Sequence, residues 1–259
     1  MPELPEVETV VRSLAPHLPG RRIVSVAFTS KHVTPGNRKA LAARFAGRVI
    51  QSVKRRGKFI VVHLDQGSFT VHLGMTGKLL LESTPGTHAY GVFQLDNGLL
   101  VYDDPRQFGS IAWETDLAHL GPEPLEIGLP DFLARLKKHK TKIKALLLNQ
   151  SFVAGVGNIY ADEILFAARV HPLAMASKLS KPRAALIHQA MREILTLAIE
   201  HRGSSISDYV DADGGRGGFQ VLHNAYGREG EPCPRCGTPI KKILVAQRGT
   251  HYCPRCQRR

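Results

Sequence analysis

The sequence of 259 residues predicts an α+β fold, with an N-terminal β-sandwich flanked by helices and a C-terminal helical domain that ends in a zinc-ribbon finger. Three observations predict it. Up to about residue 120, short segments rich in β-branched and aromatic residues follow one another closely, which is typical of a sandwich or barrel. Farther along the chain, apolar residues recur at helical spacing. All four cysteines lie within the last 27 residues.

The sandwich is expected to contain short strands that are mostly bounded by Gly or turn residues. A helix is expected before them at Glu6–Leu14, because its apolar residues fall on one helical face. A second helix is expected at Arg38–Phe45. The expected strands are Arg22–Phe28, Arg48–Val53, Phe59–Leu64, Ser68–Leu73, Lys78–Glu82, Tyr90–Leu95 and Leu99–Tyr102.

A stretch rich in Gly and Pro at residues 121–130 continues neither helix nor strand, so it predicts a hinge between domains. The domains are expected at 1–124, 131–228 and 229–259. Asp131 is expected to cap a helix at Phe132–Lys138, and Thr141 to open another at Lys142–Asn149. Further helices are expected at Ile159–Ala168 and Lys181–Glu200. The polar, Gly-rich stretch 203–218 predicts a mobile loop, either a spacer or a lid over a site.

Composition narrows the functional class. The chain has 35 Lys+Arg against 22 Asp+Glu, a formal net charge of +13, and a hydrophobic content of 43% that excludes a disordered basic tail. It lacks a run of roughly 18 apolar residues and an apolar signal sequence, so we expect a soluble, cytoplasmic protein. Such a basic excess favours a polyanionic partner such as nucleic acid. Solubility alone is the alternative explanation.

The cysteines form two CxxC pairs separated by 16 residues, Cys233/Cys236 and Cys253/Cys256. This spacing is that of a four-cysteine zinc ribbon, in which each turn directs two thiolates at one tetrahedral ion. Four sulfur ligands leave no open coordination position, so one structural Zn²⁺ ion is expected. Between the pairs, a hairpin is expected with its turn at residues 247–249. Arg248 would then lie at the tip, as a nucleic-acid contact or as an ordinary solvated residue.

The N-terminus contains a candidate nucleophile. Removal of the initiator Met, which a small second residue favours, leaves Pro2 as a secondary amine that is partly neutral near pH 7. Such an amine forms an iminium ion with an aldehyde-like carbon. Glu3 is placed to move protons if burial raises its pKa. The structural alternative is an ordinary helix start, in which acidic residues favour the helix dipole.

Five motifs resemble one family over essentially the whole chain. They are Pro2-Glu3-Leu4-Pro5-Glu6-Val7-Glu8-Thr9, His72-Leu73-Gly74-Met75-Thr76-Gly77, Asp104-Pro105-Arg106-Gln107-Phe108-Gly109, the segment Gly155–Glu163, and the zinc ribbon with Gln247-Arg248. Together they resemble the formamidopyrimidine-DNA glycosylase (Fpg/Nei) family. The resemblance implies a helix-two-turn-helix domain before the finger, and a bacterial DNA repair enzyme that acts as a monomer on double-stranded DNA containing oxidised bases.

The resemblance also implies roles for single residues. The Pro2 amine attacks C1′ of the damaged nucleotide, Glu3 assists sugar opening, Lys58 serves β-elimination, and Arg248 serves phosphate binding and δ-elimination. The flipped-out nucleotide leaves a gap. The gap-filling residues are Met75, Arg106 and Phe108, with Arg106 facing the orphaned cytosine. The DNA-binding positions are His88, Arg106, Lys140 and Asn158, and acidic residues that organise the pocket and the first helix are Glu6 and Glu163.

Several of these residues have ordinary alternatives. Lys58 would otherwise be a solvated member of the basic run 54–58, and Met75 and Phe108 would be core or strand-end residues. Two positions depart from the family pattern, because Gln107 stands where many relatives carry a second arginine and Tyr90 replaces a histidine.

The expected function is that of a bifunctional DNA glycosylase and abasic-site lyase for 8-oxoguanine and formamidopyrimidines, with DNA in a cleft between the two halves. Competing hypotheses are a sister enzyme, endonuclease VIII, that prefers oxidised pyrimidines, and a non-catalytic DNA-binding module.

Overall fold

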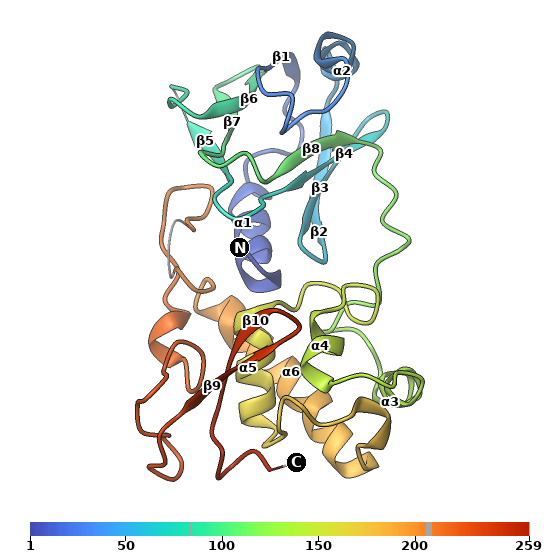
Figure 1. Ribbon diagram of the computed structural model, residues 1–259. Coiled ribbons are helices and arrows are strands. Elements are labelled where there is room, and N and C mark those ends of the chain that lie inside the picture. The colour runs from blue at the N-terminus through green and yellow to red at the C-terminus, as the bar shows by residue number, and fades with distance from the viewer. Residues whose placement is uncertain (83, 206–208, 259) are drawn as a thin grey trace. The chain divides into compact units, whose positions relative to one another are not determined.

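The computed structural model describes residues 1–82, 84–205 and 209–258. The chain divides into two compact units, one made of Met1–Leu117 with His201–Gly218 and the other of Ala118–Glu200 with Phe219–Arg259. We call them the N-terminal and the C-terminal unit (Figure 1). The division falls before the expected hinge at 121–130, and it assigns residues 201–218 to the N-terminal unit although they come late in the sequence. Among the described helices, none has the length and apolar character needed to cross a membrane.

The described strands of the N-terminal unit form two four-stranded antiparallel sheets, which confirms the sandwich. One sheet has the order β1-β6-β7-β5 and the other β2-β3-β4-β8. The bounds are β1 Ile23–Phe28, β2 Ile50–Arg56, β3 Phe59–Leu64, β4 Ser68–His72, β5 Lys78–Glu82, β6 Ala89–Leu95, β7 Leu99–Asp103 and β8 Ser110–Trp113. The strand β8 was not predicted from the sequence, because its four residues do not alternate between buried and exposed.

Aromatic side chains fill the space between the two sheets. The rings of Phe69 on β4 and Phe93 on β6 are stacked with centroids 5.3 Å apart. Phe45, at the end of α2 (Arg38–Phe45), meets both rings edge-on at 5.1 and 5.4 Å. This aromatic core joins both sheets to α2. It therefore supports the loops at the ends of the strands, two of which contain the candidate residues Met75 and Phe108.

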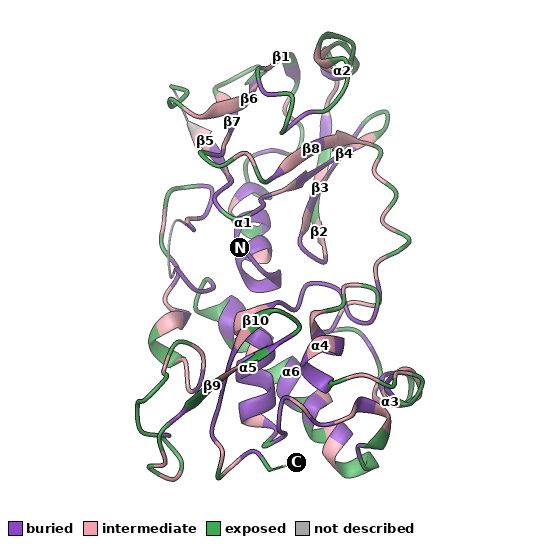
Figure 2. Ribbon diagram, in the orientation of Figure 1, coloured by how far each residue is buried: buried purple, intermediate pink, exposed green. Residues whose placement is uncertain are grey.

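The first helix, α1 (Leu4–Leu14), packs against β2 and β3 through the apolar face that the sequence predicts (Figure 2). It begins two residues earlier than expected. The reason is a reciprocal capping box, in which the Glu3 side chain accepts the N–H of Glu6 and the Glu6 carboxylate accepts the N–H of Glu3 at 2.8 Å.

The C-terminal unit is helical, with a terminal hairpin. Its helices are α3 Leu129–Lys137, α4 Ile143–Leu148, α5 Asn158–Ala167 and α6 Lys181–Glu200, and its hairpin pairs β9 Lys241–Val245 with β10 Arg248–Tyr252. Two predicted caps are wrong. Gly128 caps α3, because Pro130 fits the first turn and lets the helix begin before Asp131. Lys142 precedes α4, whose first N–H groups donate to the carbonyls of Ala174 and Pro172, so Thr141 is not needed as a cap.

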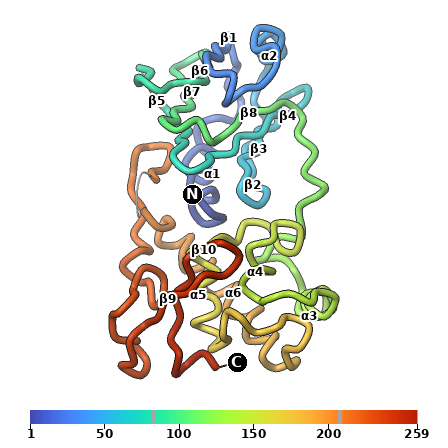
Figure 3. The backbone as a smooth tube through the Cα atoms, in the orientation of Figure 1, coloured from blue at the N-terminus to red at the C-terminus, as the bar shows by residue number. Residues whose placement is uncertain are grey.

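The segment 201–218 is packed against the N-terminal unit at its described residues, whereas the sequence predicts a mobile loop (Figure 3). The backbone N–H of Ala212 donates to Ser13 Oγ at 3.2 Å, and its carbonyl accepts the N–H of Leu81 at 3.1 Å. Buried Asp211 accepts hydrogen bonds from Arg202 and from the backbone N–H groups of Asp213 and Gly215. The part of this predicted loop at 206–208 lies outside the described residues.

Candidate active site and zinc centre

The candidate nucleophile and acid lie at the start of α1. Pro2 and Glu3 are both buried, Glu3 with 3% of its surface exposed, while Met1 is half-exposed. Glu3 is also the N-cap of α1, so its carboxylate has a structural contact as well as the predicted chemical role. The helix start therefore holds the residue next to Pro2 in one fixed position.

Glu6 joins this helix start to the segment 201–218. Its Oε2 accepts the N–H of Glu3, and its Oε1 accepts the N–H of Ser204 at 2.7 Å. The hydroxyl of Tyr209 donates to the Glu6 carbonyl at 3.2 Å. Burial, followed by the nearby Glu6 charge, raises the pKa of Tyr209, so its hydroxyl stays protonated and acts as a donor. The expected role of Glu6 in organising the first helix agrees with these contacts.

Lys58 lies in the two-residue turn between β2 and β3, directly after Gly57, which has a φ of 57°. A Gly with positive φ at the first turn position is typical of a type II′ hairpin. Lys58 is 7% exposed, which excludes a solvated lysine at this position. Arg55, from the same basic run, pairs with Glu8 of α1 at 2.9 Å and donates to the Gly57 carbonyl at 3.1 Å. This ion pair ties the turn that carries Lys58 to α1.

His72 is electrostatically coupled to Lys58. Burial lowers the pKa of His72, and the positive charge of Lys58 lowers it further. The Nδ1 atom of His72 accepts the N–H of Gly74 at 3.2 Å, which matches a neutral ring. His72 therefore stays neutral near pH 7 and places no second cation next to the buried lysine.

The predicted gap-filling residues lie on two loops at one end of the sandwich. Met75, between β4 and β5, is 41% exposed, and Phe108, between β7 and β8, is 58% exposed. The alternative that these side chains belong to the core is therefore wrong. Arg106 is exposed as well, and its guanidinium carbon lies 4.6 Å from the centre of the Phe108 ring. All three side chains are thus available to a ligand.

Asp104, to which the sequence alone assigned no role, holds these two loops together. It is fully buried and accepts hydrogen bonds from Thr76 Oγ1 at 2.6 Å and from the N–H of Gly109 at 2.9 Å. The loops also touch directly, because a Cβ at Gly74 would lie 2.5 Å from the backbone of Phe108. The signal in the sequence was an acidic residue before Pro105, which by itself predicts only a turn.

Two further residues are predicted to bind DNA, and only the first of them contacts Asp104. His88 is half-buried just before β6, and its carbonyl accepts the N–H of Asp104 at 3.1 Å. Lys140 is exposed between α3 and α4 of the C-terminal unit. The structure gives their positions, and the role of each remains a prediction.

Arg248 and Asn158 belong to two elements of the C-terminal unit, β10 and α5, that a hydrogen bond joins. Arg248 is the first residue of β10 and is exposed. The predicted turn at 247–249 is wrong, because Ala246 and Gln247 form the turn with φ values of 49° and 59°. The next carbonyl, that of Gly249, accepts a hydrogen bond from Asn158 Nδ2 at 3.0 Å. The start of α5 is thereby attached to the hairpin that carries Arg248.

A buried ion pair supports the same hairpin, and sequence reasoning missed it. Lys144 of α4 and Asp162 of α5 are 2.7 Å apart, and neither side chain is exposed. Lys144 also donates to the Gly249 carbonyl at 3.2 Å, while Asp162 accepts the N–H of His251 at 2.9 Å. Lys144 falls within a lysine-rich stretch that is typical of a solvated helix face, so the sequence carried no signal for this pairing.

Glu163 contacts the segment that leads into the finger. Its buried carboxylate accepts the N–H groups of Asn224, Ala225 and Tyr226 at 2.8–2.9 Å. Burial raises its pKa, and these three hydrogen bonds oppose the rise. Glu163 belongs to the C-terminal unit, where it holds the segment at 224–226, and its expected role in organising the pocket stays a prediction.

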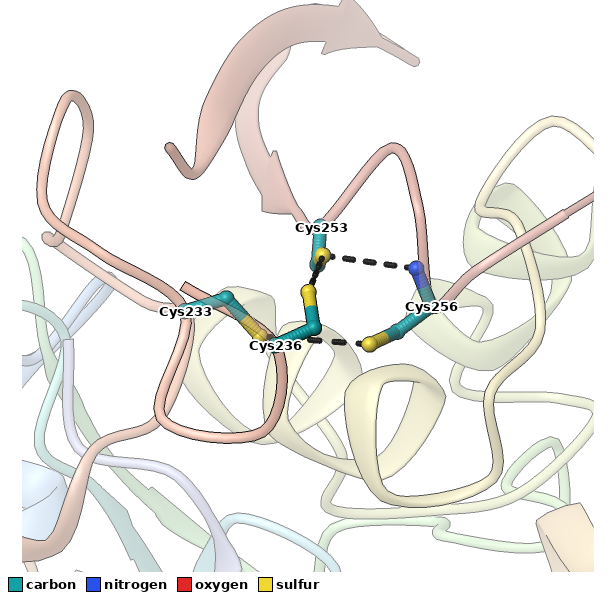
Figure 4. Close-up of side chains that lie close together, drawn as sticks. All are labelled: Cys233, Cys236, Cys253 and Cys256. Atoms are coloured by element: carbon teal, nitrogen blue, oxygen red, sulfur yellow. Dashed lines mark hydrogen bonds between the residues drawn. The ribbon is translucent and has the colours of Figure 1, made fainter. Parts of the chain in front are cut away.

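The four cysteines form the predicted metal centre, with their sulfur atoms turned toward one another (Figure 4). All four lie within 4.8 Å of one another. The Sγ atoms of Cys236 and Cys253 are 3.5 Å apart, and those of Cys233 and Cys256 are 4.0 Å apart. Four sulfurs at 2.3 Å from a tetrahedral Zn²⁺ lie about 3.8 Å apart, so this donor set fits one structural zinc ion.

Loss of the zinc is expected to unfold the finger and to leave the N-terminal sandwich folded, because the sandwich has its own core. The apolar cluster beside the metal is small, and structural zinc supplies roughly 10–16 kcal/mol in zinc-finger peptides. Cys236→Ser should lower zinc content, hairpin protection in hydrogen exchange, and duplex affinity together. Added zinc should restore the chelated wild-type protein but not the variant. A metal-free finger whose hairpin amides keep their protection from hydrogen exchange would contradict a structural role for the zinc ion.

Comparison with protein-family profiles gives three matches along the chain. Residues 1–111 match the formamidopyrimidine-DNA glycosylase N-terminal domain, and residues 120–210 match the H2TH domain of the same family. Residues 230–259 match the zinc finger found in Fpg and IleRS.

Similar proteins cover the full length. The chain is 54% identical over 265 residues to the formamidopyrimidine-DNA glycosylase of Solibacter usitatus, with 100% of both chains covered. It is similar in structure to the MutM (Fpg) protein of Thermus thermophilus, with a TM-score of 0.89 and 43% identity over 99% of this chain and 98% of that one. A Lactococcus lactis Fpg mutant in complex with a Fapy-dG containing DNA has a TM-score of 0.91 and 37% identity, with 100% of both chains covered.

Proposed function

The chain belongs to the formamidopyrimidine-DNA glycosylase family, and on that premise we propose that it is a bifunctional DNA repair enzyme. It excises oxidised purines, 8-oxoguanine and formamidopyrimidines, from duplex DNA and then cleaves the strand at the resulting abasic site. It acts as a monomer in the cytoplasm. The observation that carries the proposal is the attachment of the Lys58 turn to α1 by the Arg55–Glu8 ion pair, because it gathers amine, carboxyl and buried lysine in one unit.

The first step is nucleophilic. The Pro2 nitrogen, once Met1 is removed, forms a bond to C1′ while the bond from C1′ to the base breaks. The sugar ring opens as Glu3 transfers a proton to its oxygen, and the product is an iminium ion on the chain's own N-terminus. Pro2 and Glu3 are buried side by side in the sequence at the start of α1, and this placement supports the step.

The later steps break the bonds between the sugar and its two phosphates, which remain on the strand ends. Loss of a proton from C2′ of the iminium expels the 3′ phosphate, and Lys58 is assigned to this β-elimination. Lys58 is buried in the turn that the Arg55–Glu8 ion pair joins to α1, and this position supports the assignment. Arg248 binds phosphate during δ-elimination, which leaves a one-nucleotide gap flanked by phosphates.

Binding relies on both units. The Asn158 amide has a second N–H besides the one bound to Gly249, and we assign this N–H to a phosphate contact. His88 and Lys140 contribute further contacts to the phosphate backbone of the DNA. Exposed Met75, Arg106 and Phe108 fill the gap, with Arg106 facing the orphaned cytosine, and wedges of this kind support kinked DNA.

Borohydride trapping tests the proposal. Wild-type protein whose loss of Met1 has been verified by mass spectrometry is expected to form a reduced, covalent adduct with a duplex containing 8-oxoguanine opposite cytosine. Pro2→Gly should form the same adduct more slowly, because a primary amine replaces the secondary one. An uncleaved N-terminal extension turns the Pro2 nitrogen into an amide, so this control should bind DNA without an adduct.

The outcome separates the competing functions. If the wild-type protein lacks Met1 and still forms no adduct with any lesion-containing duplex, the enzymatic function is wrong. The non-catalytic DNA-binding module is then the remaining hypothesis. Faster trapping of oxidised pyrimidines than of 8-oxoguanine favours the endonuclease VIII type of specificity.

A further inference from the structure

We propose that Gln107 is a positioning residue, which together with Ser30 and Tyr90 holds the loop 104–109 in the shape that presents Arg106 and Phe108. We call this loop the gap loop. The inference rests on the proposed function, since it concerns how the gap-filling residues read the base opposite the lesion. Gln107 itself is half-buried and bonds to Ser30 and Tyr90, whereas the residues on either side of it are exposed.

The backbone at Gln107 has an unusual conformation. Its φ is 55°, in the left-handed region that residues other than Gly, Asn and Asp rarely adopt. Such a conformation persists only where the surroundings hold it in place. Its flanking residues both extend outward, and the Arg106 guanidinium lies over the Phe108 ring.

Two hydrogen bonds of the Gln107 side-chain amide stabilise this conformation. Its Oε1 accepts a hydrogen bond from Ser30 Oγ, and its Nε2 donates to the Tyr90 hydroxyl at 3.3 Å. Ser30 is 5% exposed and is fixed in turn, because its Oγ accepts the N–H groups of His32 and Val33 at 3.1 and 3.3 Å. The gap loop is thereby attached to the turn at 30–34 and to strand β6.

This arrangement depends on an amide at position 107. A guanidinium has N–H donors and no acceptor, so an arginine here cannot accept the Ser30 hydrogen bond. A histidine at position 90 would likewise change the partner offered to Nε2. Gln107 and Tyr90 are direct contacts of each other, and together they form an uncharged brace for the gap loop.

The consequence is for selectivity between opposite bases. A gap loop held at two points presents the Arg106 guanidinium in one position toward the base opposite the lesion. In a loosened loop, the guanidinium can adapt to different opposite bases. Loss of the brace should therefore weaken the preference for cytosine over adenine opposite the lesion. Loss of folded protein, by contrast, lowers activity on both duplexes equally.

The test compares kcat/KM on duplexes with 8-oxoguanine opposite dC and opposite dA, normalised to the fraction of enzyme that borohydride traps. Gln107→Ala removes both hydrogen bonds and is expected to lower the dC/dA ratio at least about fivefold, which is the effect of losing one net hydrogen bond. Tyr90→Phe, which removes a single hydroxyl, should lower it in the same direction. The double variant should be no lower than Gln107→Ala alone, because both changes break one network.

Gln66→Ala serves as the matched control, since Gln66 is exposed in the β3–β4 turn, and it should leave the ratio unchanged. An unchanged ratio in both Gln107→Ala and Tyr90→Phe, with normal trapping, overturns this proposal and leaves the enzymatic function standing. The absence of any adduct with the wild type overturns the function itself.

Discussion

Glu3→Gln is expected to slow base excision by roughly 10²–10⁴-fold, the usual contribution of a positioned general acid or base. The substitution is informative because Glu3 has two roles at one place. It caps α1 by accepting the N–H of Glu6, and it is the group proposed to protonate the opening sugar. A glutamine side chain keeps the accepting oxygen and loses the exchangeable proton, so the helix start should survive while the chemistry fails.

Single-turnover excision of 8-oxoguanine measures the effect, and thermal unfolding monitors the cap. Glu3→Ala is the matched control, because it loses both roles and should cost about 1 kcal/mol of stability in addition. Both variants should still bind a lesion-containing duplex. Excision by Glu3→Gln within tenfold of the wild type would rule Glu3 out as the proton donor.

Lys144→Met is expected to destabilise the C-terminal unit by about 3–5 kcal/mol, because it leaves the carboxylate of Asp162 buried without its cation. The hairpin should loosen first. Lys144 and Asp162 hold it through the Gly249 carbonyl and the N–H of His251, on either side of Thr250. Arg248 lies next to this attachment, so duplex affinity should fall as well.

Hydrogen exchange at the β10 amides is the suitable measurement, since the chain's single tryptophan, Trp113, lies in the other unit. The double variant Lys144→Met/Asp162→Asn removes both charges and should be less destabilised than Lys144→Met alone. Equal protection in the wild type and in Lys144→Met would show that the ion pair does not support the finger.

Regular segments with a clear period were predictable from the sequence. The bounds of α6 agree with prediction at both ends, and the two CxxC pairs identified the zinc centre from spacing alone. In each case the determinants are local, either a helical pattern or a short turn between ligands. The family was predictable as well, because its five motifs are short and contiguous, and the profile matches confirm it.

Features that depend on distant parts of the chain were not predictable. The first N–H groups of α4 donate to carbonyls near residue 173, which the local sequence does not indicate. The hairpin turn has positive φ at Ala246 and Gln247, two residue types that do not favour such a turn. The Lys144–Asp162 pair requires two helices to pack. Composition alone would also place Met75 and Phe108 in the core, because apolar side chains that serve a ligand do not differ in type from those that fill a core.

The N-terminal unit is built from two pieces of chain, and this has a consequence for its biosynthesis. The hydrogen bond from Ser204 to Glu6 joins residues 198 positions apart. At about 5–20 residues per second, the ribosome releases the second piece roughly 10–40 s after the first helix. Until then the Glu6 carboxylate lacks one of its partners. The N-terminal unit therefore stays incomplete while the helices of the C-terminal unit are being synthesised, and the helix start that contains Glu3 and Glu6 reaches its final set of contacts late.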